Sequence, residues 1–223
     1  MKLAGVKIII AFFFLLCVKN LNAQQKISFW DEIENFKKKD SIKFPAKNQI
    51  LFVGSSSFRM WTDVQNYFPG YKIINRGFGG SSLPDVIRYA DDIIFPYHPK
   101  QIVIYCGEND LAASDTVTAQ MVFNRFKELF VLIRKKLPQV PVAFISIKPS
   151  PSRQSLMPRM VAANRMIKNY LRKNTRTGFV DVYHKMLKAD GKPMDDIFKE
   201  DKLHMTSKGY AIWKKAIQPY LLK

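Results

Sequence analysis

The sequence predicts an α/β fold, a three-layer αβα sandwich of the flavodoxin-like type with a central parallel sheet of about five strands. From residue 50 onward, short apolar runs alternate with longer segments whose apolar residues recur at helical spacing. Most of the short runs are continuously apolar, as expected of parallel strands that are buried on both faces. Repeated strand–helix units joined by right-handed crossovers give a parallel sheet with helices on both sides.

The expected elements follow one another along the chain. Strands are predicted at residues 50–53, 72–75, 101–105, 142–145 and 179–182. Helices are predicted at residues 58–67, 84–94, 118–137, 160–173 and 206–222. A further amphipathic helix at 29–38 is expected to pack against the sheet. In the helix at 118–137, for example, one face carries apolar residues at helical spacing, namely Met121, Val122, Phe126, Leu129, Phe130 and Ile133.

Length and composition predict one domain after an N-terminal leader. The chain has 223 residues, of which 47% are hydrophobic, enough for one sizeable core. Lys2 and Lys7 precede an apolar run at 8–18 and a short polar stretch, which is the layout of a secretory signal peptide. The run is shorter than the ~20 apolar residues that a spanning helix needs. We therefore expect a signal peptide at 1–23, a helical extension at 24–48 and one α/β domain at 49–223.

The leader predicts a secreted or periplasmic protein. A lipoprotein attachment at Cys17 is less favoured, because Leu16 before it is bulkier than the residue that such sites usually carry. Cys106 is the only cysteine beyond the leader, so no intramolecular disulfide is expected. It lies in an apolar run and is interpreted as a buried packing residue.

The net charge of +18 favours anionic surfaces, including membranes, through long-range attraction. The basic residues are scattered, and no helix-turn-helix, zinc-finger or aromatic-basic RNA motif accompanies them. Nucleic acid is therefore not an expected partner. Three histidines with no H-E-x-x-H motif and no clustered Cys/His spacing give no reason to expect a metal. The sequence does not indicate an oligomeric state.

Serines follow the first predicted strand, at the carboxyl edge where functional groups of such folds collect. Gly54 is followed by Ser55, Ser56 and Ser57, and then by a helical pattern. A serine in this turn can project its hydroxyl into a cleft, but the same serines can equally cap the helix. The stretch alone leaves both interpretations open.

The next two strand ends are also rich in groups that bind anions. Residues 75–82 after the second strand include Gly79 and Gly80, which could donate a backbone N–H to an oxyanion, bind a phosphate, or form an ordinary turn. Residues 107–110 after the third strand include Asn109, whose amide can donate to a developing negative charge. An Asx-type turn is the alternative for Asn109.

A histidine near the end of the chain is the candidate base. His98 lies in a loop and His184 follows the last strand, and only His204 has a carboxylate, Asp201, three residues upstream on a turn. This spacing can bring Asp201 to one imidazole nitrogen and leave the other to accept a proton from a serine. Lone histidines are more often structural, so the local sequence leaves both a catalytic and a structural role open for His204.

Together the four stretches, in this order, resemble the SGNH or GDSL-type hydrolase superfamily over roughly residues 49–222. The resemblance implies the three-layer fold and an esterase that needs no cofactor. It implies Ser56 as the nucleophile, served by Asp201 and His204. It also implies an oxyanion hole formed by the backbone N–H groups of Ser56 and Gly80 and by the Asn109 side chain.

The first block of that family usually reads Gly-Asp-Ser, and Ser55 replaces the aspartate in this chain. Because the base comes from the last block, this change is expected to alter how the turn is braced without abolishing the chemistry. The implied reaction is a two-step acyl transfer in which Ser56 attacks an ester carbonyl and water later releases the acyl group.

The expected substrate is a glycan ester or a small-molecule ester. An exported protein with no long apolar lid looks more like the carbohydrate acetylesterases of this family than like an interfacial lipase. Loop side chains that could line the substrate cleft, or instead pack or face solvent, are Arg59, Trp61, Phe78 and Arg153. Two alternatives stay open. One is a lysophospholipase or thioesterase, and the other is a catalytically silent glycan-binding module.

Overall fold

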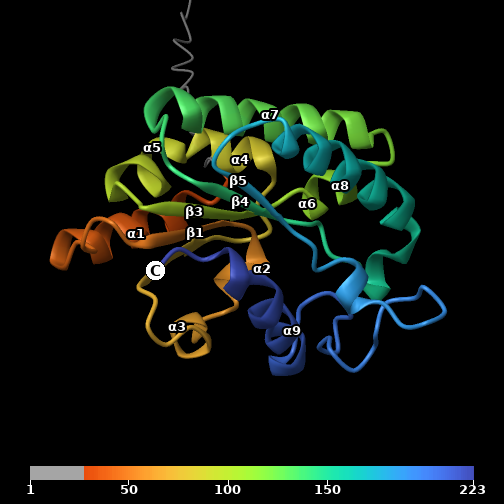
Figure 1. The fold of residues 1–223 in the computed structure, drawn as a ribbon. Helices are drawn as coiled ribbons and strands as arrows, with labels where there is room; N and C mark the ends of the chain where they lie inside the picture. Colours follow the sequence, from red (N-terminus) through yellow and green to blue (C-terminus); the bar gives the residue numbers. More distant parts are fainter. Residues whose placement is uncertain (1–27) are drawn as a thin grey trace, which may run out of the picture.

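The computed structural model describes residues 28–223. The predicted signal peptide at 1–23 lies outside the described residues. A five-stranded parallel sheet with strand order β2-β1-β3-β4-β5 lies between two layers of helices, which confirms the predicted fold class (Figure 1). The strands are β1 (Ile50–Gly54), β2 (Ile73–Gly77), β3 (Gln101–Tyr105), β4 (Val142–Ile145) and β5 (Thr177–Val180).

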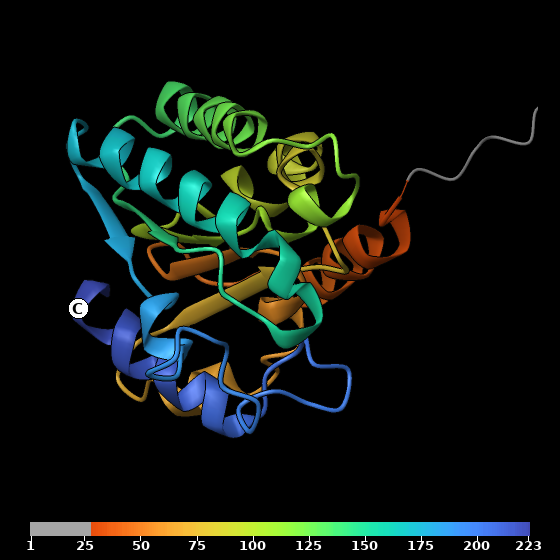
Figure 2. The ribbon, with the colours of Figure 1, turned by 90° about the vertical axis from the view of Figure 1, so that its right-hand side faces the viewer.

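Figures 1 and 2 show the two helical layers on opposite faces of the sheet. One face is covered by α4 (Leu83–Arg88), α5 (Ala90–Ile93), α7 (Ala119–Lys136) and α8 (Met157–Arg172). The other face is covered by α2 (Ser56–Arg59), α3 (Val64–Tyr67) and α9 (Ser207–Ile217). The N-terminal helix α1 (Trp30–Ile42) packs beside α5, and the short α6 (Glu108–Ala112) follows β3. Single turns of 3₁₀ helix are η1 (Phe95–Tyr97), η2 (Pro151–Leu156), η3 (His184–Met186) and η4 (Gln218–Tyr220).

Alternation along the buried strands supplies two hydrophobic cores, one on each face of the sheet. In β1, Leu51 and Val53 belong to the core beneath α4, α5, α7 and α8, whereas Ile50 and Phe52 belong to the core beneath α2, α3 and α9. Because successive side chains of a strand point to opposite faces, one continuous apolar run fills both cores. Cys106 is fully buried in the first core, which confirms its interpretation as a packing residue.

Two predicted helices are each split in the structure. The segment at 58–67 forms α2 and α3, and the segment at 84–94 forms α4 and α5. Between α2 and α3, the N–H of Trp61 bonds the carbonyl of Phe58, and the N–H of Val64 bonds the carbonyl of Trp61. In such turns the hydrogen bond joins residues three apart, so the apolar side chains keep nearly the spacing of a helix although the chain bends. Periodicity alone therefore does not reveal the interruption between α2 and α3.

Strands β1 and β3 approach each other so closely at their carboxyl ends that only glycine fits at position 54. Gly54 ends β1 with φ of +138°, and a Cβ there would lie 1.9 Å from the carbonyl oxygen of Tyr105. The glycine therefore lets β1 and β3 stay paired up to the residue that precedes the serines.

Among residues 28–223, no helix has the length and apolar character needed to cross a membrane.

Candidate active site

The strand order brings the predicted site residues to one edge of the sheet. β1 lies between β2 and β3, so the ends of these three strands are adjacent, at the switch in strand order. Ser56 is the first residue of α2 after β1, and Asn109 lies in α6 after β3. Gly80 follows β2 and lies against Asn109, because a Cβ on Gly80 would be 3.6 Å from Asn109 Nδ2.

Ser56, His204 and Asp201 form a hydrogen-bonded series. His204 Nε2 lies 3.0 Å from Ser56 Oγ. His204 Nδ1 lies 2.6 Å from Asp201 Oδ2. The carboxylate therefore fixes Nδ1 as the protonated nitrogen, which leaves the lone pair of Nε2 directed at the serine hydroxyl.

Asp201 is held in its charged form. Its burial acts to raise the pKa, but the hydrogen bonds from the His204 side chain and from the backbone N–H groups of His204 and Leu203 outweigh burial. The net result lowers the pKa of Asp201 to about 2. The carboxylate is therefore ionised at any pH at which a histidine could act as a base.

The loop that carries Asp201 and His204 is tied to the segment after β4. Within the loop, Lys199 N–H donates to the carbonyl of His204 at 2.7 Å, and Lys202 N–H donates to the carbonyl of Lys199 at 2.9 Å. Ser152 donates to the carbonyl of Lys202 through both its backbone N–H, at 3.1 Å, and its Oγ, at 3.0 Å. These bonds fix the position of the loop relative to the sheet.

Asn109 lies beside the first serine of the turn. Its Nδ2 donates to Ser55 Oγ at 3.0 Å and to the carbonyl of Ser81 at 3.2 Å. Ser55 is therefore not a helix cap with its side chain, but an acceptor that orients the Asn109 amide.

Two side chains predicted to line the substrate cleft do not do so. Trp61 and Phe78 are both fully buried. Trp61 stacks on Tyr210 with ring centroids 4.6 Å apart, and Phe78 packs edge-on against Phe29 at 5.4 Å. Both predictions are wrong, because the rings are part of the hydrophobic cores and no surface is left to contact a substrate.

The two predicted basic residues have different surroundings. Arg59, at the end of α2, has a side chain 55% exposed, and its Nε pairs with Glu32 at 2.8 Å. Arg153, in η2, is mostly buried, and its Nη1 lies 3.7 Å from the carboxylate of Glu108. Substrate contact by either residue stays a prediction.

A second aspartate–histidine pair was missed in the sequence. His184 Nδ1 lies 2.7 Å from Asp181 Oδ2, at the same three-residue spacing as in the pair of His204. The sequence pattern extended the last strand through Asp181, but β5 ends at Val180, so Asp181 begins the turn. The expectation that only His204 has such a partner is therefore wrong.

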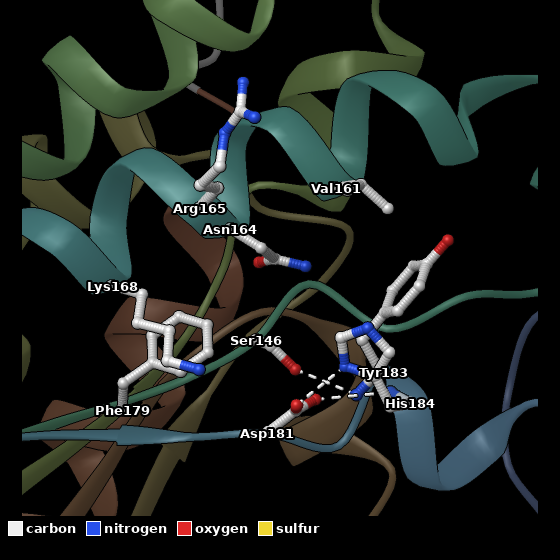
Figure 3. Close-up of a pocket in the computed structure, with 9 residues that line it drawn as sticks. All are labelled: Ser146, Val161, Asn164, Arg165, Lys168, Phe179, Asp181, Tyr183 and His184. Atoms are coloured by element: carbon white, nitrogen blue, oxygen red, sulfur yellow. Dashed lines mark hydrogen bonds and ion pairs between the residues drawn. The ribbon is translucent and has the colours of Figure 1, made fainter.

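This second pair borders a cavity of about 170 Å³ between α8 and β5 (Figure 3). The serine of that cavity, Ser146, is buried, and its Oγ accepts the backbone N–H groups of Val182 and Tyr183 at 3.0 Å each. In the part of the chain that the structure describes, His184 has no hydrogen bond to a serine. The pair therefore lacks the third member that His204 has.

Sequence reasoning also missed a buried charged cluster beneath the site. Glu108 accepts hydrogen bonds from Lys148 Nζ at 2.9 and 3.1 Å, from Tyr105 Oη at 2.7 Å and from Ser150 Oγ at 2.9 Å. Lys148 is 1% exposed. Glu108 precedes Asn109, and Lys148 precedes the segment that holds the 199–204 loop.

The described residues contain no group of three His, Cys, Asp or Glu side chains that could hold a metal.

A serine, histidine and aspartate in hydrogen-bonded series at the carboxyl edge of a parallel sheet is an arrangement typical of serine hydrolases. The sequence model of the GDSL-like lipase/acylhydrolase family matches residues 52–212, and the chain belongs to this family. Membership of this acylhydrolase family confirms the resemblance to the GDSL-type hydrolase superfamily.

Solved structures share the fold. A GDSL-like lipase from Bacteroides thetaiotaomicron has a TM-score of 0.71 at 21% identity, over 84% of this chain and 95% of that chain. A protein of Streptococcus pneumonia, proposed to be a platelet activating factor, has a TM-score of 0.75 at 20% identity, over 86% and 92%. An acetylxylan esterase from Geobacillus stearothermophilus has a TM-score of 0.63 at 14% identity, over 81% and 97%.

One curated protein is similar in sequence. An N-acylneuraminate cytidylyltransferase from Escherichia coli O18:K1:H7 is 23% identical over 207 residues, which are 91% of this chain. The chain spans about half, 47%, of the length of that relative.

Proposed function

We propose that the protein is a serine esterase that uses Ser56, His204 and Asp201 as a catalytic triad and removes acetyl groups from carbohydrates. The observation that carries the proposal is the hydrogen-bonded series from Ser56 Oγ through His204 to Asp201, at 3.0 and 2.6 Å. It supplies a nucleophile with a base within reach, and a carboxylate that orients the base.

The proposed reaction follows from these contacts. Ser56 Oγ attacks the ester carbonyl while His204 Nε2 takes its proton, and the ionised Asp201 stabilises the imidazolium. When the tetrahedral intermediate collapses, the C–O bond to the alcohol breaks and His204 returns the proton to the alcohol. Water then attacks the acyl-serine by the same proton path, which releases the acid and regenerates Ser56.

The negative oxygen of the tetrahedral intermediate would be held by the backbone N–H groups of Ser56 and Gly80 and by the Asn109 amide. Replacement of Asn109 with alanine is expected to raise the barrier by about 3 kcal/mol, a fall of about a hundredfold in kcat. Steady-state hydrolysis of p-nitrophenyl acetate measures this. A KM that changes while kcat does not would instead assign Asn109 to ground-state binding.

The two aspartate–histidine pairs provide a matched comparison. We expect His204→Ala to lose nearly all turnover, because Ser56 loses its base. We expect His184→Ala, in which the same kind of pair is broken, to keep kcat within about twofold, as for other exposed substitutions outside a site. Equal losses in the two variants, measured with the same ester, would contradict the assignment of the base.

Short acyl groups are favoured by what surrounds the site. The large apolar side chains that are exposed in residues 28–223 are Trp30, Ile42, Phe44, Met121, Val131, Val161, Tyr220 and Leu222. None of them lies in the segments that carry Ser56, Gly80, Asn109 or the 199–204 loop, so among the described residues these segments offer no fully exposed large apolar side chain to a long acyl chain. Similarity in fold to an acetylxylan esterase agrees with an acetylated carbohydrate as substrate.

A substrate panel tests the proposal. Acetate release from acetylated xylo-oligosaccharides and other acetylated glycans is compared with hydrolysis of lysophosphatidylcholine and acyl thioesters. We expect acetylated sugars to be preferred. Clear preference for long acyl chains would make the protein a lysophospholipase or thioesterase. No hydrolysis of any ester, with no adduct from a fluorophosphonate, would favour a silent glycan-binding module.

We further propose that the protein acts outside the cytoplasm, after removal of residues 1–23, on glycan esters. Residues 1–23 contain three lysines and no acidic residue, so their removal would lower the net charge from +18 to +15, which would still favour association with anionic surfaces. Mass spectrometry of the mature N-terminus from fractionated cells tests this, and an intact Met1 in the cytoplasmic fraction would contradict it.

A further inference from the structure

Helix α1 lies outside the segment matched by the family model, residues 52–212, yet it touches the glycine loop of the site. Glu32 Oε2 accepts the backbone N–H of Gly79 at 3.0 Å. Gly79 immediately precedes Gly80, the proposed oxyanion donor. The Glu32 carboxylate, from the N-terminal extension, thus holds the N–H of Gly79 in place. The next N–H along the chain, that of Gly80, is the one that must face the substrate.

The same carboxylate also reaches the helix that begins with the nucleophile. Arg59 Nε, at the other end of the four-residue α2, lies 2.8 Å from Glu32 Oε2. Glu32 therefore joins two segments of the site, the glycine loop after β2 and the helix after β1. Arg59 offsets the negative charge of Glu32, which would otherwise oppose an oxyanion forming nearby.

The docking of α1 is specific. Gly79 has φ of +32°, and a Cβ there would lie 2.3 Å from the ring of Phe29, so the loop fits α1 only with glycine at this position. Further along α1, Asp40 accepts hydrogen bonds from Arg76 Nη2 and Tyr97 Oη, both at 2.5 Å. The extension is thus attached both at the glycine loop and by a mostly buried ion pair.

We propose that α1 is a working part of the active site and that Glu32 is a positioning residue for the oxyanion hole. Glu32 fixes the Gly79–Gly80 segment so that the Gly80 N–H is directed at the developing oxyanion, and its pairing with Arg59 sets the distance between this segment and α2. The inference rests on the proposed function, because it assigns Gly80 as an oxyanion donor. It adds a functional residue outside the part of the chain that defines the family.

The test uses three variants of the full chain with p-nitrophenyl acetate and an acetylated xylo-oligosaccharide. Glu32→Ala removes the acceptor, and we expect kcat to fall about tenfold or more with little change in KM, because only the transition state is affected. Glu32→Gln keeps an oxygen acceptor for the Gly79 N–H and should restore most of kcat. Glu34→Ala, on the same helix and paired only with Lys37 among the described residues, is the control that should behave as wild type.

The outcomes separate the inference from the proposed function. If wild-type protein neither hydrolyses esters nor is labelled by a fluorophosphonate, the proposed function fails and takes the inference with it. If wild type is active and Glu32→Ala keeps wild-type kcat, only the inference is overturned. A fall in kcat that Glu32→Gln does not reverse, or that comes with an equal fall for Glu34→Ala, would assign α1 a structural role alone and would also overturn it.

Discussion

Replacement of Ser56 with alanine is expected to eliminate turnover while the fold stays intact. Ser56 Oγ is the only serine oxygen within hydrogen-bond distance of His204 among the described residues, at 3.0 Å. Loss of the nucleophile of a triad typically lowers kcat by a factor on the order of 10⁴ to 10⁶. Acetate release and labelling by a fluorophosphonate measure the loss, and circular dichroism verifies the fold.

The neighbouring serines are the matched controls. Ser57 is buried, and its carbonyl accepts a hydrogen bond from Tyr210 Oη at 2.8 Å, so Ser57→Ala leaves that bond in place. Ser55→Ala removes one acceptor of the Asn109 amide but leaves the carbonyl of Ser81 to orient it. Both variants should retain substantial activity. Substantial turnover by the Ser56→Ala protein would rule out Ser56 as the nucleophile.

The sheet could be predicted from sequence because each strand is encoded locally. A strand buried on both faces is a continuous apolar run, whichever strands it pairs with. The helices between the runs indicate that the strands are parallel. The last strand was predicted two residues late for a tertiary reason. The N–H groups of Val182 and Tyr183 donate to the Ser146 hydroxyl rather than to a neighbouring strand. The apolar run therefore extends to Val182, although strand pairing ends at Val180.

The site shows the same division between local and tertiary information. Asp201 and His204 meet across three residues, so their spacing sufficed to predict the contact. Trp61 was assigned to the cleft wrongly, because an aromatic residue near a functional turn has the same local sequence whether it faces solvent or a core. Glu32 lies 47 residues from Gly79, and no local pattern marks that bond.

The buried pair of Glu108 and Lys148 also joins distant segments, 40 residues apart, and it carries the second large prediction. Lys148→Met is expected to destabilise the fold by about 3–5 kcal/mol, because it leaves Glu108 buried without its nearest opposite charge. Arg153 would compensate for the loss of Lys148 only in part, since its Nη1 lies 3.7 Å from the carboxylate, whereas Lys148 Nζ lies at 2.9 Å. Urea unfolding monitored by circular dichroism measures the change.

The double variant Glu108→Gln/Lys148→Met separates loss of the pair from loss of packing. Both charges of the pair are removed and Arg153 loses only a partner 3.7 Å away, so this variant should regain much of the stability lost in Lys148→Met. A double variant no more stable than the single one would mean that the aliphatic stem of Lys148, rather than its charge, stabilises the fold. A Lys148→Met protein as stable as wild type would contradict the prediction outright.

The pH dependence of stability gives an independent check on the same pair. Burial of Glu108 acts to raise its pKa, but the charges of Lys148 and Arg153 and the hydrogen bonds from Tyr105 and Lys148 outweigh burial and lower the pKa. The stability that Glu108 contributes is therefore present above the pKa of an unfolded glutamate, about 4.3, and is lost as the pH falls through the lower folded value. Wild type should lose stability on acidification below about pH 4, and the double variant should lose less over the same interval because its position 108 carries no ionisable group. Parallel curves for the two proteins would show that the Glu108 carboxylate contributes nothing through its charge.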